Sequence, residues 1–399
     1  MSSTIARAGA GLRRMLPRDS AQAHRPASAL ELFFDLVFVV AVSFASVSLH
    51  HLETEGELSR AVIGYLMVFF AIWWAWMNFT WFATSFDTDD WLYRVTTIVQ
   101  MAGVLVVAAG AEGAMIGGDF TLPVIGYIIM RLAMVSQWIR AGITSRLFRA
   151  TALRYAGGIA LVQVLWIAWL LVIPPDAKPW GFLVLAICEV LVPVISEQPR
   201  TTPWHAHHIA ERYGLFTLIL LGESLLASAH AIIEALHEAE NVAPLVTLSA
   251  CGLAIVAGMW WIYFSREQHE HLVSLPHALL FGYSHYVIFA AAGAISAGIE
   301  VAVDATTHET HLGTVAAAAT TTVPIALFIV GIWALTIRRT LPTWANVAVP
   351  TLAVLIALSA IVPGTLVVTA ALVVVAVVVV QMTAPAGEPM AAVLPEGDD

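Results

Sequence analysis

Twelve long apolar runs follow one another along the chain, separated by short polar or proline-containing segments. A membrane-spanning helix needs about 20 mostly apolar residues, and each run comes close to that length. The pattern therefore predicts an all-α, polytopic membrane protein with about 12 transmembrane helices. The predicted helices cover residues 29–49, 60–82, 93–111, 121–139, 155–173, 179–195, 208–232, 244–264, 277–301, 315–337, 345–361 and 365–381.

The basic residues divide unevenly between the two sides of such a bundle. If both termini are cytoplasmic, 15 arginines fall on the cytoplasmic side, Arg212 among them, and only Arg60 and Lys178 fall on the other side. The outer loops are instead rich in Asp, Glu and His. Cytoplasmic loops of membrane proteins carry the excess of Lys and Arg. We therefore expect a multi-pass protein of the bacterial inner (plasma) membrane, with both termini cytoplasmic.

Composition excludes several other classes of protein. Of the 399 residues, 59% are hydrophobic and only 12% are charged, whereas soluble domains have about 25% charged residues. The lipid bilayer is the partner that such a surface requires. The net charge of -10 comes from acidic loops and an acidic C-terminus, so no nucleic-acid partner is expected. Cys188 and Cys251 both lie inside apolar runs, which favours buried thiols over a disulfide framework.

The second half of the chain repeats features of the first half in the same order. A run of six helices is an even number, so two such halves would insert in the same direction, related by an axis along the membrane normal. The sequence thus predicts two tandem six-helix repeats of the same orientation. The matching pairs are residues 73–76 (WWAW) with 260–263 (WWIY), residues 110–112 (GAE) with 298–300 (GIE), Phe34 with Phe216, Pro123 with Pro324, and Pro174 with Pro363.

This internal repeat divides the chain into five segments. Residues 1–28 form a basic cytoplasmic tail, and residues 29–195 form the first six-helix repeat. Residues 196–207 are a cytoplasmic linker, residues 208–381 form the second repeat, and residues 382–399 form an acidic C-terminal tail.

Three sequence blocks resemble the bacterial low temperature requirement protein A family. They are residues 29–39 (ALELFFDLVFV), residues 73–78 with 87–90 (WWAWMN and DTDD), and residues 211–224 (ERYGLFTLILLGES). The resemblance implies a multi-pass bacterial inner-membrane protein, tied by name to growth in the cold, with no settled biochemical activity. A weaker similarity is to potassium channels built from two six-helix repeats. Arg212 and Phe216 keep the spacing of the R-x-x-x-F-S-D motif of those channels, but Thr217 and Leu218 replace its Ser-Asp.

Five ionisable residues lie inside predicted spans, where charge is costly and often functional. They are Asp35, Arg131, Glu189, Glu223 and His285. A rise of 1.5 Å per residue places Arg131 at nearly the same depth as Asp35 and Glu189. We therefore expect Arg131 to pair with one of these carboxylates while the other titrates. A purely structural ion pair is the alternative. Either way, these five residues are the predicted substrate or ion pathway.

A set of tryptophans recurs in the two halves and is predicted to be an aromatic scaffold. Trp is favoured at membrane interfaces, where its N–H stays hydrated, so an interfacial anchor is the first interpretation. A cage for a cation is the alternative. The residues are Trp73, Trp74, Trp76, Trp260 and Trp261.

The segment around His207 and Glu211 has the four-residue spacing of metal ligands on a helix. It lacks the H-E-x-x-H pattern, and no phosphate loop, nucleophile elbow or catalytic cysteine arrangement is present, so no metal, cofactor or catalytic residue is predicted. The repeats and intramembrane charges favour a transporter or permease for a small solute or ion. The alternatives are a non-transporting envelope stress-response protein and an intramembrane enzyme. Substrate and oligomeric state stay open.

Overall fold

The computed structural model describes residues 12–20, 22, 25–238, 243–307 and 309–383, and within them the fold is helical, with no strand. Among the described residues, ten helices are long and apolar enough to cross a membrane, and α13 is a shorter apolar helix. The α-helices are α1 (Ala29–Thr54), α2 (Leu58–Phe86), α3 (Trp91–Ala109), α4 (Ala111–Gly117), α5 (Thr121–Thr144), α6 (Arg149–Val172), α7 (Lys178–Ser196), α8 (Ala206–Glu238), α9 (Ala243–Tyr263), α10 (Leu275–Thr307), α11 (Thr314–Leu335), α12 (Thr343–Leu358) and α13 (Thr365–Gln381).

All twelve predicted runs are helical, which confirms the all-α class, but several helices extend beyond their apolar runs. Hydropathy marks only the apolar part of a helix, whereas the backbone ladder continues until a residue breaks it. Glycines with positive φ follow two of the extended helices, Gly56 after α1 (φ 82°) and Gly118 after α4 (φ 70°). Such left-handed glycines commonly end helices. Helix α4 continues α3 to form one span, Trp91–Gly117.

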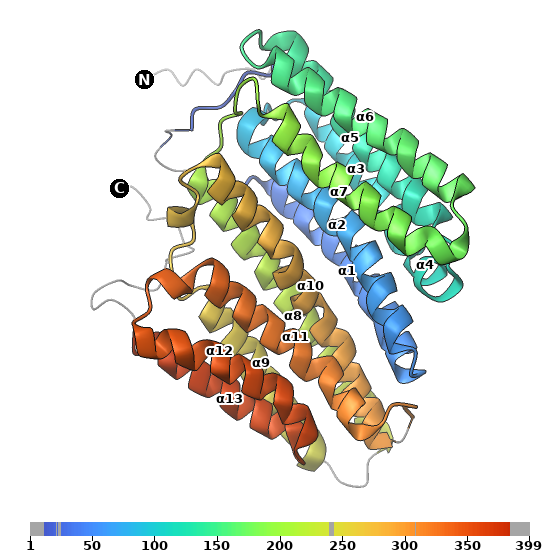
Figure 1. The fold of residues 1–399 in the computed structure, drawn as a ribbon, viewed down its shortest axis with the longest axis vertical. Coiled ribbons are helices and arrows are strands. Elements are labelled where there is room, and N and C mark those ends of the chain that lie inside the picture. The colour runs from blue at the N-terminus through green and yellow to red at the C-terminus, as the bar shows by residue number, and fades with distance from the viewer. Residues whose placement is uncertain (1–11, 21, 23–24, 239–242, 308, 384–399) are drawn as a thin grey trace, which may run out of the picture.

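The helices form two groups that lie side by side (Figure 1). One group contains α1 to α7 and the other contains α8 to α13. Helices α1 and α2 of the first group pack against α8 and α10 of the second. We call this contact zone the seam.

Within the two groups the helices pack in the same order. In the first group α1 contacts α2 and α3, α3 contacts α5, α5 contacts α6, and α6 contacts α7. In the second group α8 contacts α9 and α10, α10 contacts α11, α11 contacts α12, and α12 contacts α13. The two groups thus share one order of helix packing among the described residues.

Small residues bring one matched helix pair into very close contact in both groups. A Cβ atom on Gly126 of α5 would lie 2.5 Å from the Gly103 carbonyl oxygen of α3. In the second group a Cβ atom on Gly298 of α10 would lie 2.5 Å from the Thr320 carbonyl oxygen of α11. Close backbone approach at small residues is a common means of joining helices in membranes.

The two groups meet through different surfaces. If a two-fold axis related the groups, it would place α1 on α8 and α10 on α3. The contact between α1 and α10 would then have a counterpart between α8 and α3. Among the described residues, α8 and α3 show no comparable packing. The interface is therefore heterologous, with a different face contributed by each half.

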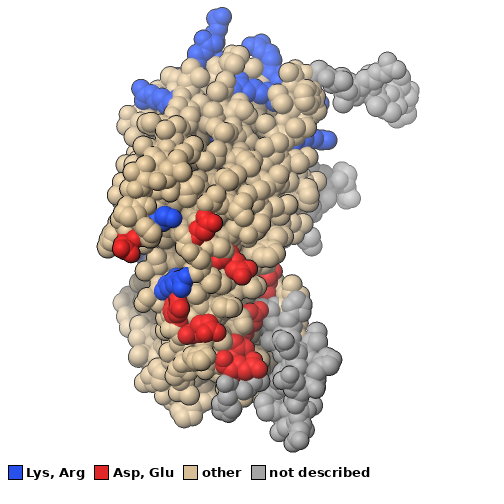
Figure 2. Space-filling view, turned by 90° about the vertical axis from the view of Figure 1, so that its right-hand side faces the viewer, with Lys and Arg blue, Asp and Glu red and all other residues tan. Residues whose placement is uncertain are grey.

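Charged side chains separate along the length of the molecule. Lys and Arg lie mostly at one end, whereas Asp and Glu gather toward the other (Figure 2). Both described chain ends lie at the basic end, where Arg266 donates to the carbonyl oxygen of Thr383 at 3.0 Å. The cytoplasmic location of this end stays a prediction. Arg212, which was counted with the cytoplasmic segments, lies within α8 and has a fully buried side chain.

The described residues between 12 and 28 run across the basic end of the first half, and we call them the N-terminal strap. Met15 is fully buried, and its carbonyl oxygen accepts a hydrogen bond from Thr144 at 2.8 Å. The backbone N–H of Arg18 donates to the Ser85 carbonyl oxygen at 2.9 Å. The basic segment is thus packed onto the bundle in this region.

Candidate functional site

Two acidic residues of α1 are placed by the way that helix begins. Ser28 and Glu31 form a reciprocal capping box, in which Glu31 Oε2 accepts the Ser28 backbone N–H at 2.8 Å. The other oxygen of Glu31 is left to face the seam. Asp35 lies one helical turn further on, so both carboxylates point in the same direction. Glu31 is 1% exposed and Asp35 is 0% exposed.

The cationic partner comes from the other half of the protein. Arg212 of α8 forms a bidentate contact with Asp35, with Nη2 at 2.5 Å and Nε at 3.1 Å from the two carboxylate oxygens. Its Nη1 lies 3.0 Å from Glu31 Oε1. His208, one turn earlier on α8, places Nε2 at 3.0 Å from the same Glu31 oxygen. One arginine therefore serves two buried carboxylates across the seam.

Ion pairs continue from this group to the surface. Arg25 in the strap lies 3.9 Å from Glu31 and 3.7 Å from Asp87, and Arg18 lies 3.1 Å from Asp87. Burial raises the pKa of the Asp87 carboxyl, and the two arginines oppose that effect. We call the alternating series Arg18, Asp87, Arg25, Glu31, Arg212 and Asp35 the ionic chain.

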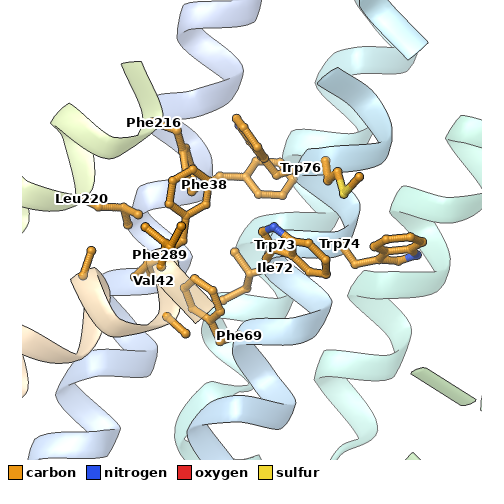
Figure 3. Close-up of a cluster of buried hydrophobic side chains, with 14 of the residues drawn as sticks. Phe38, Val42, Phe69, Ile72, Trp73, Trp74, Trp76, Phe216, Leu220 and Phe289 are labelled. Atoms are coloured by element: carbon orange, nitrogen blue, oxygen red, sulfur yellow. The ribbon is translucent and has the colours of Figure 1, made fainter. Parts of the chain in front are cut away.

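Aromatic side chains close the seam beyond the ionic chain. The indole N–H of Trp76 donates to Asp35 at 2.6 Å, and the Trp76 ring stacks on Phe216 with centroids 4.5 Å apart. Phe289 of α10 lies 5.1 Å from the Phe216 ring, and Phe38 of α1 lies in the same cluster (Figure 3). All of these side chains are fully buried. Together they form what we call the aromatic barrier, namely Phe38, Trp76, Phe216 and Phe289.

A second set of polar groups follows on the far side of the barrier. Ser43 of α1 hydrogen-bonds to Glu223 of α8. Further along α1, His50 lies 2.7 Å from Asp304 and 3.2 Å from Glu300 of α10. We call these five residues the outer polar station. The predicted candidate Glu223 thus lies on the same seam as Asp35.

Arg131 and Glu189 form a separate cluster inside the first half. Arg131 Nη2 lies 3.0 Å from Glu189 Oε2, and both side chains are at most 1% exposed. The same carboxylate accepts four more hydrogen bonds, with lengths of 2.8 to 3.3 Å. We call this group the Glu189 cluster. Its other donors are Trp74 of α2, Tyr127 of α5, and Gln163 and Trp166 of α6.

Arg131 was expected to pair with either Asp35 or Glu189, and the structure pairs it with Glu189. Asp35 instead meets Arg212. Helix depth alone cannot distinguish these partners, because residues at equal depth can lie on opposite sides of a wide bundle. Asp35 faces the seam, whereas Glu189 faces the interior of the first half.

His285 is buried in the second half, away from both acidic groups. Its Nε2 lies 3.1 Å from the Tyr263 hydroxyl, and its Nδ1 lies 2.7 Å from the Phe281 carbonyl oxygen. Its ring is 4.9 Å from Phe289, which belongs to the aromatic barrier. His285 therefore lies beside the seam without joining the ionic chain.

The tryptophans of the first half are core residues and not interfacial anchors. Trp73, Trp74 and Trp76 are at most 2% exposed, because α2 lies in the middle of the molecule. Trp76 does face a cation, since the Arg212 guanidinium lies 5.9 Å from its ring. Trp261 is 39% exposed and donates to Gln381, and Trp260 packs against the core.

The described residues hold no group of three or more His, Cys, Asp or Glu arranged for a metal ion. His207 stacks on His269 at 3.7 Å, and Glu211 accepts the Ala27 backbone N–H at 3.1 Å. These contacts attach the start of α8 to neighbouring segments.

Sequence reasoning missed three residues of the seam, namely Glu31, His208 and Arg212. The signals were present: a serine three residues before Glu31 is a capping-box pattern. In addition, Glu31 and Asp35, like His208 and Arg212, are spaced by four residues and so share a helix face. All three lie within the first few residues of a predicted span, where charge is ordinary.

The long apolar helices and the charges buried between them define an integral, multi-pass membrane protein. Residues 26–382 match the model of the bacterial low temperature requirement A protein (LtrA), and the chain belongs to this family. It is also 30% identical to an uncharacterized protein of Rhizobium meliloti (strain 1021) over 262 residues. That match covers 61% of this chain and 59% of the relative, so it spans less than two thirds of the relative's length.

Proposed function

We propose that the protein is a transporter that moves a small ion or solute across the bacterial plasma membrane along its seam. The pathway begins at the ionic chain, crosses the aromatic barrier and ends at the outer polar station. The observation that carries this proposal is the ionic chain, which links the surface at Arg18 to a carboxylate buried between two halves of the protein. Buried charges inside membranes are costly and commonly mark such routes.

The sharing of Arg212 gives this site a way to change its charge. Both Glu31 and Asp35 contact Arg212, so either carboxylate can release it while the other keeps it paired. A proton or a small cation arriving at Asp35 would then leave the ion pair between Arg212 and Glu31 intact. This exchange avoids a stranded buried charge, which is the main cost of breaking such a pair.

The aromatic barrier provides the closed state. Its side chains fill the seam between the two polar groups and leave the transported species no hydrated route. Because α1 and α2 belong to one half and α8 and α10 to the other, a small rotation of the halves would separate these rings. Packed interfaces between rigid helix groups are a recurring site of such movements.

We infer that the two halves arose by duplication and that both termini are cytoplasmic. The shared order of helix packing supports duplication. The arginine-rich end of the bundle supports the orientation.

A flux measurement tests the function. Purified protein is reconstituted into liposomes on a solid-supported membrane, and charge displacement is recorded after steps of pH, Na⁺ and K⁺. We expect wild-type currents above those of empty liposomes, and their loss in Glu223→Gln. Glu112→Gln, an exposed acid on α4, is the matched control and should behave as wild type. Absence of wild-type current for every ion would contradict ion transport.

The rival is a membrane protein without transport activity. It is favoured by the Glu189 cluster, in which five side chains satisfy one carboxylate and leave it no role beyond holding helices together. If the ionic chain is equally static, substitutions there will change stability alone. Recording flux and unfolding on the same variants separates the two functions.

A further inference from the structure

A long apolar groove opens on the side of the protein between its two halves. It has a volume of about 500 Å³ and is formed by α2 and α7 of the first half and α10 of the second. Grooves of this size accommodate ligands the size of a drug or a lipid chain. Its walls include Ile63, Phe70, Trp73, Leu191, Tyr283 and Tyr286.

The only hydroxyls in the wall are already used by the protein. Tyr283 donates to the Val190 carbonyl oxygen at 2.9 Å, and Tyr286 donates to the Leu66 carbonyl oxygen at 2.8 Å. These bonds tie α10 to α7 and to α2. The tyrosines therefore offer the groove their rings, and the groove accepts an apolar occupant.

The length of the groove matches one leaflet of a bilayer. On α2 its lining runs from Ile63 to Trp73, and on α7 it runs from Pro179 to Leu191. At 1.5 Å per residue these segments measure about 15 and 18 Å. Half of a hydrocarbon core of about 30 Å is about 15 Å. An acyl chain entering from the nearer surface would extend along the whole groove.

The two basic residues of the predicted outer loops, Arg60 and Lys178, lie at the starts of two helices that line the groove, α2 and α7. Arg60 lies one turn before Ile63 on α2 and is 46% exposed, and Lys178 directly precedes Pro179 at the start of α7. Arg60 contacts Glu57 at 2.8 Å, but both side chains are about half exposed, and exposed ion pairs are weak. In Figure 2 this end of the molecule is otherwise rich in Asp and Glu. The Lys178 ammonium lies 5.7 Å from the ring centroids of Phe120 and Trp169 and donates to the Gly118 carbonyl oxygen at 3.4 Å. A lipid phosphate at this end of the groove would draw it away from these weak, exposed contacts.

We propose that this groove binds one acyl chain of an anionic phospholipid, whose phosphate contacts Arg60 and Lys178. Charge at the mouth selects the headgroup, and the apolar walls hold the chain. Because the groove joins α7 and α2 to α10, the bound lipid contacts both halves of the protein. It therefore occupies a place from which it can favour one relative position of the halves.

Native mass spectrometry of the purified protein, titrated with phosphatidylglycerol or phosphatidylcholine of identical chains, tests this site. Wild type should bind phosphatidylglycerol roughly tenfold more tightly, since each basic residue near a headgroup adds substantially to anionic-lipid binding. The double variant Arg60→Gln/Lys178→Gln should bind both lipids equally. The matched control Arg146→Gln/Arg338→Gln removes two exposed charges from the opposite end and should keep the preference.

A second variant locates the chain. Ala186→Phe adds a ring to the groove wall and should reduce binding of both lipids, whereas Ala168→Phe, on the exposed face of α6, should not. Equal binding of the two lipids by wild type would overturn the proposal. So would a preference that survives Arg60→Gln/Lys178→Gln, or unchanged binding by a folded Ala186→Phe variant.

Discussion

The Glu189 cluster and the ionic chain are both buried charge networks, yet they differ in almost every other respect. Glu189 receives one arginine and four neutral donors, all from helices of the same half. Asp35 and Glu31 instead share Arg212 across the seam, and their network reaches the surface at Arg18. A carboxylate whose lone pairs are all engaged is held in place. A carboxylate that shares one arginine with a second carboxylate can release that arginine and bind another cation or a proton. Burial alone does not distinguish a structural charge from a functional one, but connectivity does.

The second half of the chain sharpens this comparison. Under the proposed duplication, Ile332 stands where Arg131 stands, and Val378 stands where Glu189 stands. Both halves nevertheless pack their helices in the same order. The fold therefore does not need the Arg131–Glu189 pair, and apolar residues can replace it, as they often replace buried ion pairs without loss of stability.

The largest expected effect is on stability. Arg131→Ala leaves Glu189 charged and buried without its cation, and we expect it to destabilise the protein by about 3–5 kcal/mol. The paired variant Arg131→Met/Glu189→Leu, which imitates the second half, should recover most of that loss. Unfolding in detergent, followed by circular dichroism, measures both.

A double-mutant cycle then distinguishes the two networks. Arg131→Ala should couple to Glu189→Gln by more than about 1 kcal/mol but to Asp35→Asn by less than about 0.5 kcal/mol. Asp35→Asn should couple instead to Arg212→Gln. Strong coupling between Arg131 and Asp35 would mean that the two networks are one.

The next effect concerns the aromatic barrier. Phe216→Ala removes a ring that stacks on Trp76 and leaves space in the aromatic barrier. We expect a severalfold increase in ion leak through reconstituted protein. Phe120→Ala, a buried ring beside Trp169 in the first half, is the control and should not leak. Equal ion leak in both variants would show that the aromatic barrier does not specifically close the seam to ions.

The smallest effect concerns the attachment of the N-terminal strap. Asp90 accepts hydrogen bonds from Arg140 and from the backbone N–H of Arg13 at 2.9 Å. Burial works to raise the pKa of this carboxyl, but these bonds outweigh it and hold the pKa at about 2. A carboxyl group with a lowered pKa stabilises the folded contact fully when the pH is above its ordinary pKa near 4. This stabilisation is lost as the pH falls toward 2.

The strap should therefore stay attached at neutral pH and loosen only below about pH 4. Asp90→Asn should loosen it at neutral pH. Accessibility of a cysteine introduced at Met15, whose side chain is fully buried in the attached strap, to a water-soluble maleimide reports the attachment. Asp89→Asn, whose partner is the exposed Arg94, serves as the control. A strap that stays protected in Asp90→Asn would assign its attachment to other contacts.

The sequence predicted the helices well because apolar runs of about 20 residues have few other solutions in a membrane. It also identified Asp35, Arg131 and Glu189, which are buried charges, and Glu223, which is partly buried. It did not predict which residue each charge pairs with, because depth along a helix gives no information on which side of a bundle a residue faces. Arg212 was missed for a related reason, since it lies near a span end in sequence but deep inside the seam in three dimensions.

The most direct test compares flux in two reconstituted variants. Asp35→Asn alters one seam carboxylate, whereas Arg131→Met/Glu189→Leu removes the whole ion pair of the Glu189 cluster. Both variants are first shown to be folded in detergent, and charge displacement is then recorded beside wild type. The account predicts that Asp35→Asn abolishes transport and that the paired variant transports normally. Normal transport by Asp35→Asn, with loss in the paired variant, would contradict it.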